Sequence, residues 1–315
     1  MQAVVYTGPL TIEVQEIPEP EAAPGEVVVD VRAVGICGSE LEGFASQSPF
    51  RVPPLVMGHE FAGVRTDTGD HVAVNPLVAC GRCDICARGL ANVCRHRQIV
   101  GIQRPGGYAE RVAVPAVNCH PVPAGVPFTT LALAEPLANG VHALGLVQRY
   151  DPWPQRVGVI GGGAIGLGQA LLAKGRGIPQ VELCDLSPDR LAAARRAGIS
   201  VREGELAGEY DVVFDTVGSA STRGASTALV RPGGTAMWVG LHGDDADLNG
   251  RAMIRNEVRV LTTFGYSQHE FRIAVGFASA LQPDWIGAAP MAEGAETFRM
   301  LLSGPAAATK MMLVR

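Results

Sequence analysis

The chain has 315 residues, of which 47% are hydrophobic, and its formal net charge is −5. This length is sufficient for two domains, and a mildly acidic chain without an extended basic patch is not expected to bind nucleic acid. No stretch approaches the roughly 18 apolar residues of a membrane span, and the N-terminal residues lack the pattern of a signal peptide. We therefore expect a cytoplasmic protein that binds neither a membrane nor nucleic acid.

The first 140 residues carry mainly strand patterns. A β-branched run over 27–34 ends at Gly35. Shorter strand patterns follow between glycine and proline turns, at residues 61–65, 71–75 and 108–114. This part of the chain is therefore predicted to form a β-rich domain.

From about residue 155 the pattern changes, because apolar strands alternate with helices rich in alanine and leucine. This alternation predicts βαβ units and a doubly wound parallel sheet. A helix near residue 270 and a last strand at 309–314 follow. We predict an α/β fold in three segments: a β-rich domain over 1–140, an inserted α/β domain over 141–270, and a return to the first domain over 271–315.

Two motifs of the β-rich part contain possible metal ligands. Cys37 follows the valine-rich strand, and His59 precedes Glu60 after a proline-rich turn. Alone, each is ambiguous, since a cysteine after a strand is often a small buried residue and a single histidine is often structural. Together with the motifs described next, they indicate a catalytic zinc, which needs three protein ligands and one open position.

Four cysteines lie close together in a lobe over about 76–98. Their spacing is C-x2-C-x2-C-x7-C, formed by Cys80, Cys83, Cys86 and Cys94. Four thiols so spaced suit a tetrahedral site with zinc as the usual occupant. Two disulfides or an iron–sulfur cluster are the alternatives, but the other three cysteines are scattered and no second cysteine run exists. We predict a structural zinc.

A dinucleotide-binding motif begins the α/β part. An apolar strand over 156–160 is followed by a G-x-G-x-x-G turn and a helix. The motif residues are Gly161, Gly163, Ala164, Ile165 and Gly166. Its glycines allow a tight turn and a close approach of a pyrophosphate, which the N-terminus of the helix then binds.

The residues after the next strand indicate which dinucleotide binds. Asp185 ends that strand, where a carboxylate accepts hydrogen bonds from the adenosine ribose and repels a 2′-phosphate, so NAD is favoured over NADP. Ser187 and Pro188 predict the start of a helix. Arg190 in its first turn either reaches the ribose or is a solvated helix residue. A flavin is the alternative ligand.

Several motifs together resemble the zinc-dependent medium-chain dehydrogenases, within the sorbitol, threonine and galactitol-phosphate dehydrogenase branch. They are GICGSE, MGHEFAG, GDHVAVNP, the four-cysteine lobe, GGYAE, AEPLANGVHA, GGGAIG and VRPGG. The resemblance implies a GroES-like catalytic domain with an inserted Rossmann domain. It also implies two zinc ions per chain, one catalytic and one structural, and a homodimer or homotetramer.

The resemblance also implies roles for individual residues. Cys37 and His59 would ligate the catalytic zinc, with Glu60 or Glu135 as the third ligand. Ser39 matches the hydroxyl that contacts the substrate oxygen.

The proton relay departs from the pattern of the family. Glu42 stands where many relatives have a histidine, so the relay ends in Glu42, uses water or runs through Glu60. Glu40 resembles an acid that orients the metal histidine, the alternative being a surface charge.

The implied reaction is hydride transfer between NAD and a secondary alcohol of a polyol, sugar or sugar-like ring. Two alternatives are a physiological ketone or aldehyde reductase and a non-catalytic dinucleotide-binding relative. Arg51 and Arg104 are each able to receive a substrate phosphate, although a solvated surface role is favoured for both. Tyr266 falls where polyol dehydrogenases have a residue near the substrate.

Overall fold

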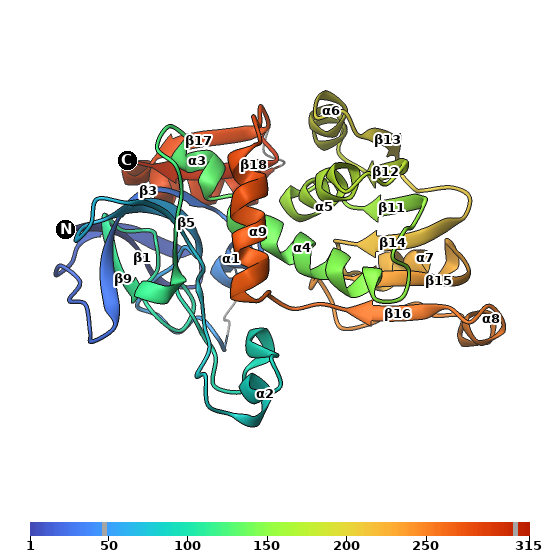
Figure 1. Cartoon of the computed structure of the whole chain (residues 1–315). Coiled ribbons are helices and arrows are strands. Elements are labelled where there is room, and N and C mark those ends of the chain that lie inside the picture. Colours follow the sequence, from blue (N-terminus) through green and yellow to red (C-terminus); the bar gives the residue numbers. More distant parts are fainter. Residues whose placement is uncertain (46–48, 305–307) are drawn as a thin grey trace. The chain divides into compact units, whose positions relative to one another are not determined.

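The structure, a computed structural model, describes residues 1–45, 49–304 and 308–315. These residues form two compact units, each with its own sheet (Figure 1). The first unit combines Met1–Ala138 with Tyr266–Arg315, and the second is Asn139–Gly265. The sequence places the changes of domain after residues 140 and 270, and the units divide after Ala138 and Gly265.

The first unit is built on a seven-stranded sheet, in which the valine-rich strand β3 (Glu26–Gly35) is central. The other strands are β5 (Glu60–Arg65), β6 (His71–Val74), β9 (Arg111–Pro115), β10 (Cys119–Pro121), β17 (Ile286–Pro290) and β18 (Lys310–Val314). Strand β3 pairs antiparallel with β5, β9 and β18, so residues from both ends of the sequence meet on it. The predicted return of the chain to its first domain is therefore made by β18.

A smaller sheet and several helices complete this unit. The sheet has the order β2 (Thr11–Glu16), β1 (Gln2–Gly8) and β4 (Leu55–Val56). The helices include α1 (Gly38–Ala45), α3 (Phe128–Leu131), α9 (Gln268–Ser279) and α10 (Gly294–Ser303). Aromatic rings join these layers in the core, where Phe298 lies edge-on to Phe44 at 5.4 Å and to Tyr108 at 5.6 Å between ring centroids. This packing fixes α1, which follows Cys37, against α10.

The four-cysteine lobe has little core of its own. It contains the pair β7 (Leu77–Val78) and β8 (Gln98–Ile99), the short helix α2 (Asp84–Ala87) and a 3-10 turn at Ala91–Val93. Helix α2 has no buried residue. Because apolar burial contributes so little here, the lobe needs another source of order, which a bound metal can supply.

The second unit is the predicted doubly wound sheet. Six parallel strands have the order β13, β12, β11, β14, β15 and β16. Their bounds are β11 (Arg156–Ile160), β12 (Gln180–Asp185), β13 (Ser200–Glu203), β14 (Tyr210–Asp215), β15 (Val230–Trp238) and β16 (Arg259–Thr262). The strand order reverses at β11, between β12 and β14, and ligands of such sheets bind at the carboxyl ends of the strands at this point.

The helices of this unit connect its strands. They are α5 (Ala164–Gly175), α6 (Pro188–Arg196), α7 (Ala220–Ala228) and α8 (Gly250–Arg255), while α4 (Ala134–Gln148) crosses the boundary between the units in sequence. The predicted start of α6 is confirmed, since Ser187 caps it and its hydroxyl accepts from the Arg190 backbone N–H. Among the described residues, no helix combines the length and apolar character of a membrane span.

Candidate active site and metal sites

Cys37, His59 and Glu60 meet at the end of the central strand pair. Gly35 of β3 lies opposite Glu60 of β5 in the antiparallel register, so Cys37 just beyond β3 comes next to the residues at the start of β5. One ligand atom from each of the three residues lies within 4.8 Å of the others. A thiol, an imidazole and a carboxylate this close to one another are suitable ligands for one zinc ion.

Glu40 holds the residues of this group in place through hydrogen bonds. Its buried carboxylate accepts from the backbone N–H groups of Gly58, at 2.9 Å, and Cys37, at 3.1 Å. It also lies 2.9 Å from Nδ1 of His59 and accepts from the Tyr108 hydroxyl. With Nδ1–H donated to Glu40, Nε2 of His59 keeps its lone pair for a metal. The alternative that Glu40 is a surface charge is wrong.

Lys310 is a buried cation that the sequence analysis did not identify. Its side chain is 4% exposed and forms an ion pair with Glu60, which is 1% exposed. The Lys310 ammonium also donates to the Ile36 carbonyl at 2.9 Å. Gly35 makes room for this pair, since a Cβ there would lie 2.2 Å from Glu60 Oε2 and 2.8 Å from Lys310 Cε. The signal in the sequence is a lysine at the start of an otherwise apolar strand.

Glu135 occupies a neighbouring position. It lies in the first turn of α4, and its Oε1 accepts from the Tyr266 hydroxyl at 2.7 Å. Burial raises the pKa of the Glu135 carboxyl, with His59 acting in the opposite direction. Among the described residues, the compact set of ligand atoms contains Glu60 and does not contain Glu135.

A hydroxyl and a guanidinium lie beside Cys37. The Ser39 hydroxyl is 3.3 Å from Cys37 Sγ, and Arg51 Nη2 donates to Ser39 Oγ at 3.0 Å. Arg51 is only 7% exposed, so the favoured surface role of this residue is wrong. Arg104 instead forms an ion pair with Glu26. Glu42, one of the three alternatives for the proton relay beside water and Glu60, is an exposed residue of α1.

The electrostatics of the site favour a cation. Burial alone would lower the pKa of His59, yet the Glu40 carboxylate and Cys37 raise it well above the usual range. Burial would likewise lower the pKa of Lys310, and Glu60 and Cys37 raise it. In both cases the cause is the negative charge of a neighbouring carboxylate and of Cys37, which a divalent ion held by the thiolate, imidazole and carboxylate would offset.

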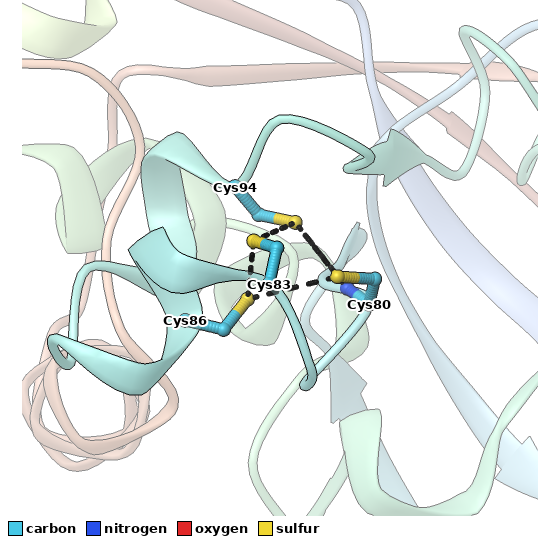
Figure 2. A group of neighbouring side chains, drawn as sticks. All are labelled: Cys80, Cys83, Cys86 and Cys94. Carbon is cyan, nitrogen blue, oxygen red and sulfur yellow. Dashed lines mark hydrogen bonds between the residues drawn. The ribbon is translucent and has the colours of Figure 1, made fainter.

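The four cysteines of the lobe form a second compact set (Figure 2). The sulfur–sulfur distances are 3.5 Å for Cys80–Cys94, 3.6 Å for Cys83–Cys86, 3.8 Å for Cys83–Cys94 and 4.0 Å for Cys80–Cys86. Sulfurs about 2.3 Å from a central ion form a tetrahedron with edges of about 3.8 Å. All four cysteines are free, so the disulfide alternative does not fit. The backbone N–H of Cys86 helps to lower the pKa of Cys83 to about 6, which favours its thiolate.

The glycine motif lies at the carboxyl end of β11. Gly161 has φ +99°, and a Cβ on Gly166 would lie 1.8 Å from the Gly161 carbonyl oxygen, so both positions require glycine. Gly163 caps α5, whose first residues are Ala164 and Ile165. The turn therefore presents the N-terminus of α5 as the motif predicts.

Two aspartates organise the neighbouring turns. Asp185 accepts from the backbone N–H groups of Gly162 at 2.6 Å and Ser187 at 2.7 Å, and it lies 3.5 Å from the Arg190 guanidinium. Asp215, which the sequence analysis did not single out, accepts from the N–H groups of Val217 and Gly218 at the end of β14. The sequence feature that could have identified Asp215 is its position at the end of a buried strand, shortly before Gly218.

Comparisons with known proteins agree with this architecture. A family model described as the alcohol dehydrogenase GroES-like domain matches residues 23–124, and one described as zinc-binding dehydrogenase matches residues 164–280. D-altritol 5-dehydrogenase of Agrobacterium fabrum is 33% identical over 267 residues, which are 79% of each chain. L-galactonate-5-dehydrogenase of Escherichia coli is 32% identical over 255 residues, which are 72% of each chain.

The solved structures show the same fold over the whole chain. A zinc-binding dehydrogenase from Sinorhizobium meliloti, bound to NADP, superposes with a TM-score of 0.91 at 27% identity and covers 100% of this chain and 99% of its own. A GroES-like domain joined to a Rossmann-like sheet, with these relatives, defines an oxidoreductase that acts on CH–OH groups. The chain belongs to the zinc-dependent medium-chain dehydrogenase family. The predicted family and fold class are confirmed.

Proposed function

We propose that this protein oxidises a secondary alcohol of a polyol, sugar or sugar-like compound, with NAD as hydride acceptor and zinc at the alcohol oxygen. The observation that carries the proposal is the compact set of Cys37, His59 and Glu60 with the Ser39 hydroxyl beside it. The names of two relatives, D-altritol 5-dehydrogenase and L-galactonate-5-dehydrogenase, support the substrate class.

Each residue of the site would have a distinct role. Cys37, His59 and Glu60 would hold the zinc, with Glu135 near enough to the group to be a replacement carboxylate. When bound, zinc supplies a Lewis acid for the alcohol oxygen and NAD supplies the hydride acceptor. Ser39 would take the alcohol proton and pass it towards solvent, with water or exposed Glu42 as the outer end.

A second zinc in the lobe would be structural. Cys80, Cys83, Cys86 and Cys94 supply four sulfur ligands. A site closed by four thiolates has no open position for a substrate, so its contribution would be to folding.

NAD rather than NADP would be the preferred cofactor. The turn after β11 would receive the pyrophosphate, through Gly161, Gly163, Ala164, Ile165 and Gly166. Asp185 places a carboxylate at the end of β12, where it would bind ribose hydroxyls and repel a 2′-phosphate. Arg190 already lies near the Asp185 carboxylate, so it would act on the ribose mainly through that group. The NADP-bound relative makes the cofactor a property to measure directly.

The family resemblance also supports a homodimer or homotetramer. Strand β16 is at the edge of the six-stranded sheet. The resemblance to the polyol dehydrogenases implies that this strand would pair with a second subunit. A physiological reductase would use the same residues in the reverse direction. The intact Cys37, His59 and Ser39 argue against a non-catalytic relative.

The test is reduction of NAD and NADP by the purified protein across polyols, sugar acids, sugar phosphates, amino alcohols and simple secondary alcohols, with and without a strong chelator. We expect chelator-sensitive turnover with NAD on one of these substrate classes and none in a Cys37→Ser variant. Turnover that persists both in the presence of the chelator and in the Cys37→Ser variant would contradict the zinc mechanism. Absence of turnover from zinc-loaded protein in either direction would contradict the proposed activity.

A further inference from the structure

A buried arginine next to the candidate alcohol site has more hydrogen-bonding capacity than the described residues around it use. Arg51 is 7% exposed, whereas its neighbours Phe50 and Val52 are 68% and 69% exposed. The chain thus turns a cation inward between two apolar side chains that face solvent. Arg51 is therefore not a solvated surface residue. Burying a guanidinium costs free energy unless it has a partner.

Residues 49–304 and the other described parts of the chain provide hydrogen-bond partners for only part of the guanidinium. Nη2 donates to Ser39 Oγ at 3.0 Å, while Nε is buried and has no hydrogen-bond partner among the described residues. Within that part of the chain, Arg51 also forms no ion pair. The Arg51 guanidinium interacts electrostatically with the Glu40 carboxylate. That carboxylate already binds His59, Tyr108 and two backbone N–H groups.

The position of the guanidinium is built into helix α1. A Cβ on Gly43 would lie 2.9 Å from Arg51 Cδ and 3.0 Å from Nη1, so the absence of a side chain lets the arginine lie against the helix. The same helix carries Ser39 in its first turn. The cation is therefore held one hydroxyl away from Cys37, at the place where the alcohol would react.

We propose that Arg51 binds an anionic substituent of the substrate, so that this enzyme acts on an acidic polyol, either a sugar acid or a sugar phosphate. The proposal deepens and rests on the proposed function. Nη2 is at Ser39, and among the described residues Nε has no partner and no carboxylate forms an ion pair with the guanidinium. An oxyanion carried near the reacting carbinol would offset this charge. Arginine suits this task because its planar fork binds carboxylate and phosphate through two parallel hydrogen bonds.

The experiment compares matched substrates in the zinc-loaded protein. Each set has one stereochemistry and three forms: the neutral alditol, the aldonate and the alditol phosphate. We expect wild type to prefer one anionic form, and Arg51→Gln to reduce the anionic-to-neutral ratio of kcat/KM by about 10- to 100-fold, mainly through KM. The aldonate and phosphate arms identify which anion the site takes.

Two further variants separate charge from position. Arg51→Lys keeps the charge without the fork and should recover only part of the ratio. Gly43→Ala keeps the arginine but displaces it, and should lower the ratio while leaving the thermal stability close to wild type, since alanine favours a helix. Arg104→Gln, which removes an arginine already paired with Glu26, should leave the ratio unchanged.

The outcomes distinguish this inference from the proposed activity. An equal loss on neutral and anionic substrates in Arg51→Gln would mean that the charge acts on Ser39 and Cys37, and would overturn the inference while the activity stands. Calorimetric binding of an aldonate and of inorganic phosphate, with NADH present, needs no turnover. Binding that is equally strong in wild type and Arg51→Gln would also overturn it.

Discussion

The buried charges around Cys37 show how single residues position a candidate catalytic group. Glu40 fixes the ring of His59 and Lys310 offsets the charge of Glu60, so these two possible metal ligands are each held by a second side chain. Such supporting partners orient ligands and tune their basicity. The chain has two lysines, and the one on this site is buried while Lys174 is exposed.

This contrast between the two lysines makes a prediction. Lys310→Met should lower the free energy of unfolding by about 3–5 kcal/mol, because it leaves the Glu60 carboxylate buried without its cation. The measurement is urea denaturation followed by circular dichroism, with both variants and the wild type stripped of metal by a chelator, because a zinc ion on Glu60 would replace the lost cation. Lys174→Met is the matched control and should cost less than about 1 kcal/mol, since this side chain is exposed and donates to the Gly198 carbonyl. Equal losses in the two variants would contradict the structural role of Lys310.

At the scale of elements, the four-cysteine lobe is the part of the first unit that depends most on a ligand. Its helix α2 has no buried residue, and the four sulfurs lie in contact with one another. The printed contacts between the four sulfurs are no longer than 4.0 Å. Without an ion, thiolates this close would repel one another, because they carry like charges. The order of the lobe should therefore follow its metal content.

A cysteine substitution tests this dependence. Cys83→Ser should reduce bound zinc from two ions to one per chain and speed amide exchange over residues 77–99, because three sulfurs hold the ion less firmly. Elemental analysis and hydrogen-exchange mass spectrometry measure the two effects. Cys119→Ser, a buried thiol in β10, should keep both ions. Unchanged zinc content in Cys83→Ser would show that these sulfurs do not hold the metal.

The elements also show which parts of the site are readable from sequence. The four cysteines and the glycine turn were predictable because each motif is local, so spacing alone brings its members together. Glu40 was predictable only through the family resemblance. The contact of Lys310 with Glu60 was not predictable, because it depends on β18 pairing with β3 next to β5. The burial of Arg51 escaped for a related reason, since arginine between two apolar residues in a proline-rich loop is typical of a surface.

At the scale of the whole molecule, the two ligands of the reaction belong to different units of the chain. Both candidate metal sites lie in the first unit, whereas the glycine turn, Asp185 and Asp215 lie in the second. Each unit has its own sheet and its own buried core residues. Because a ligand stabilises the structure that it binds, zinc and the cofactor should each protect a different set of backbone amides from hydrogen exchange.

Peptide-resolved hydrogen exchange can measure this protection in the intact protein. A chelator should deprotect the lobe and the segments around Cys37 and His59, and should leave β11, β12 and β14 unchanged. NADH at about 100 times its Kd should instead protect the carboxyl ends of those strands, with a limit of about 2.7 kcal/mol for amides that exchange through global opening. Chelator-induced exchange that is as strong in β11 as in the lobe would contradict the separation. It would mean that the parallel sheet depends on metal for its stability, although its hydrogen-bonded register of six strands contains no metal-binding residue set among the described residues.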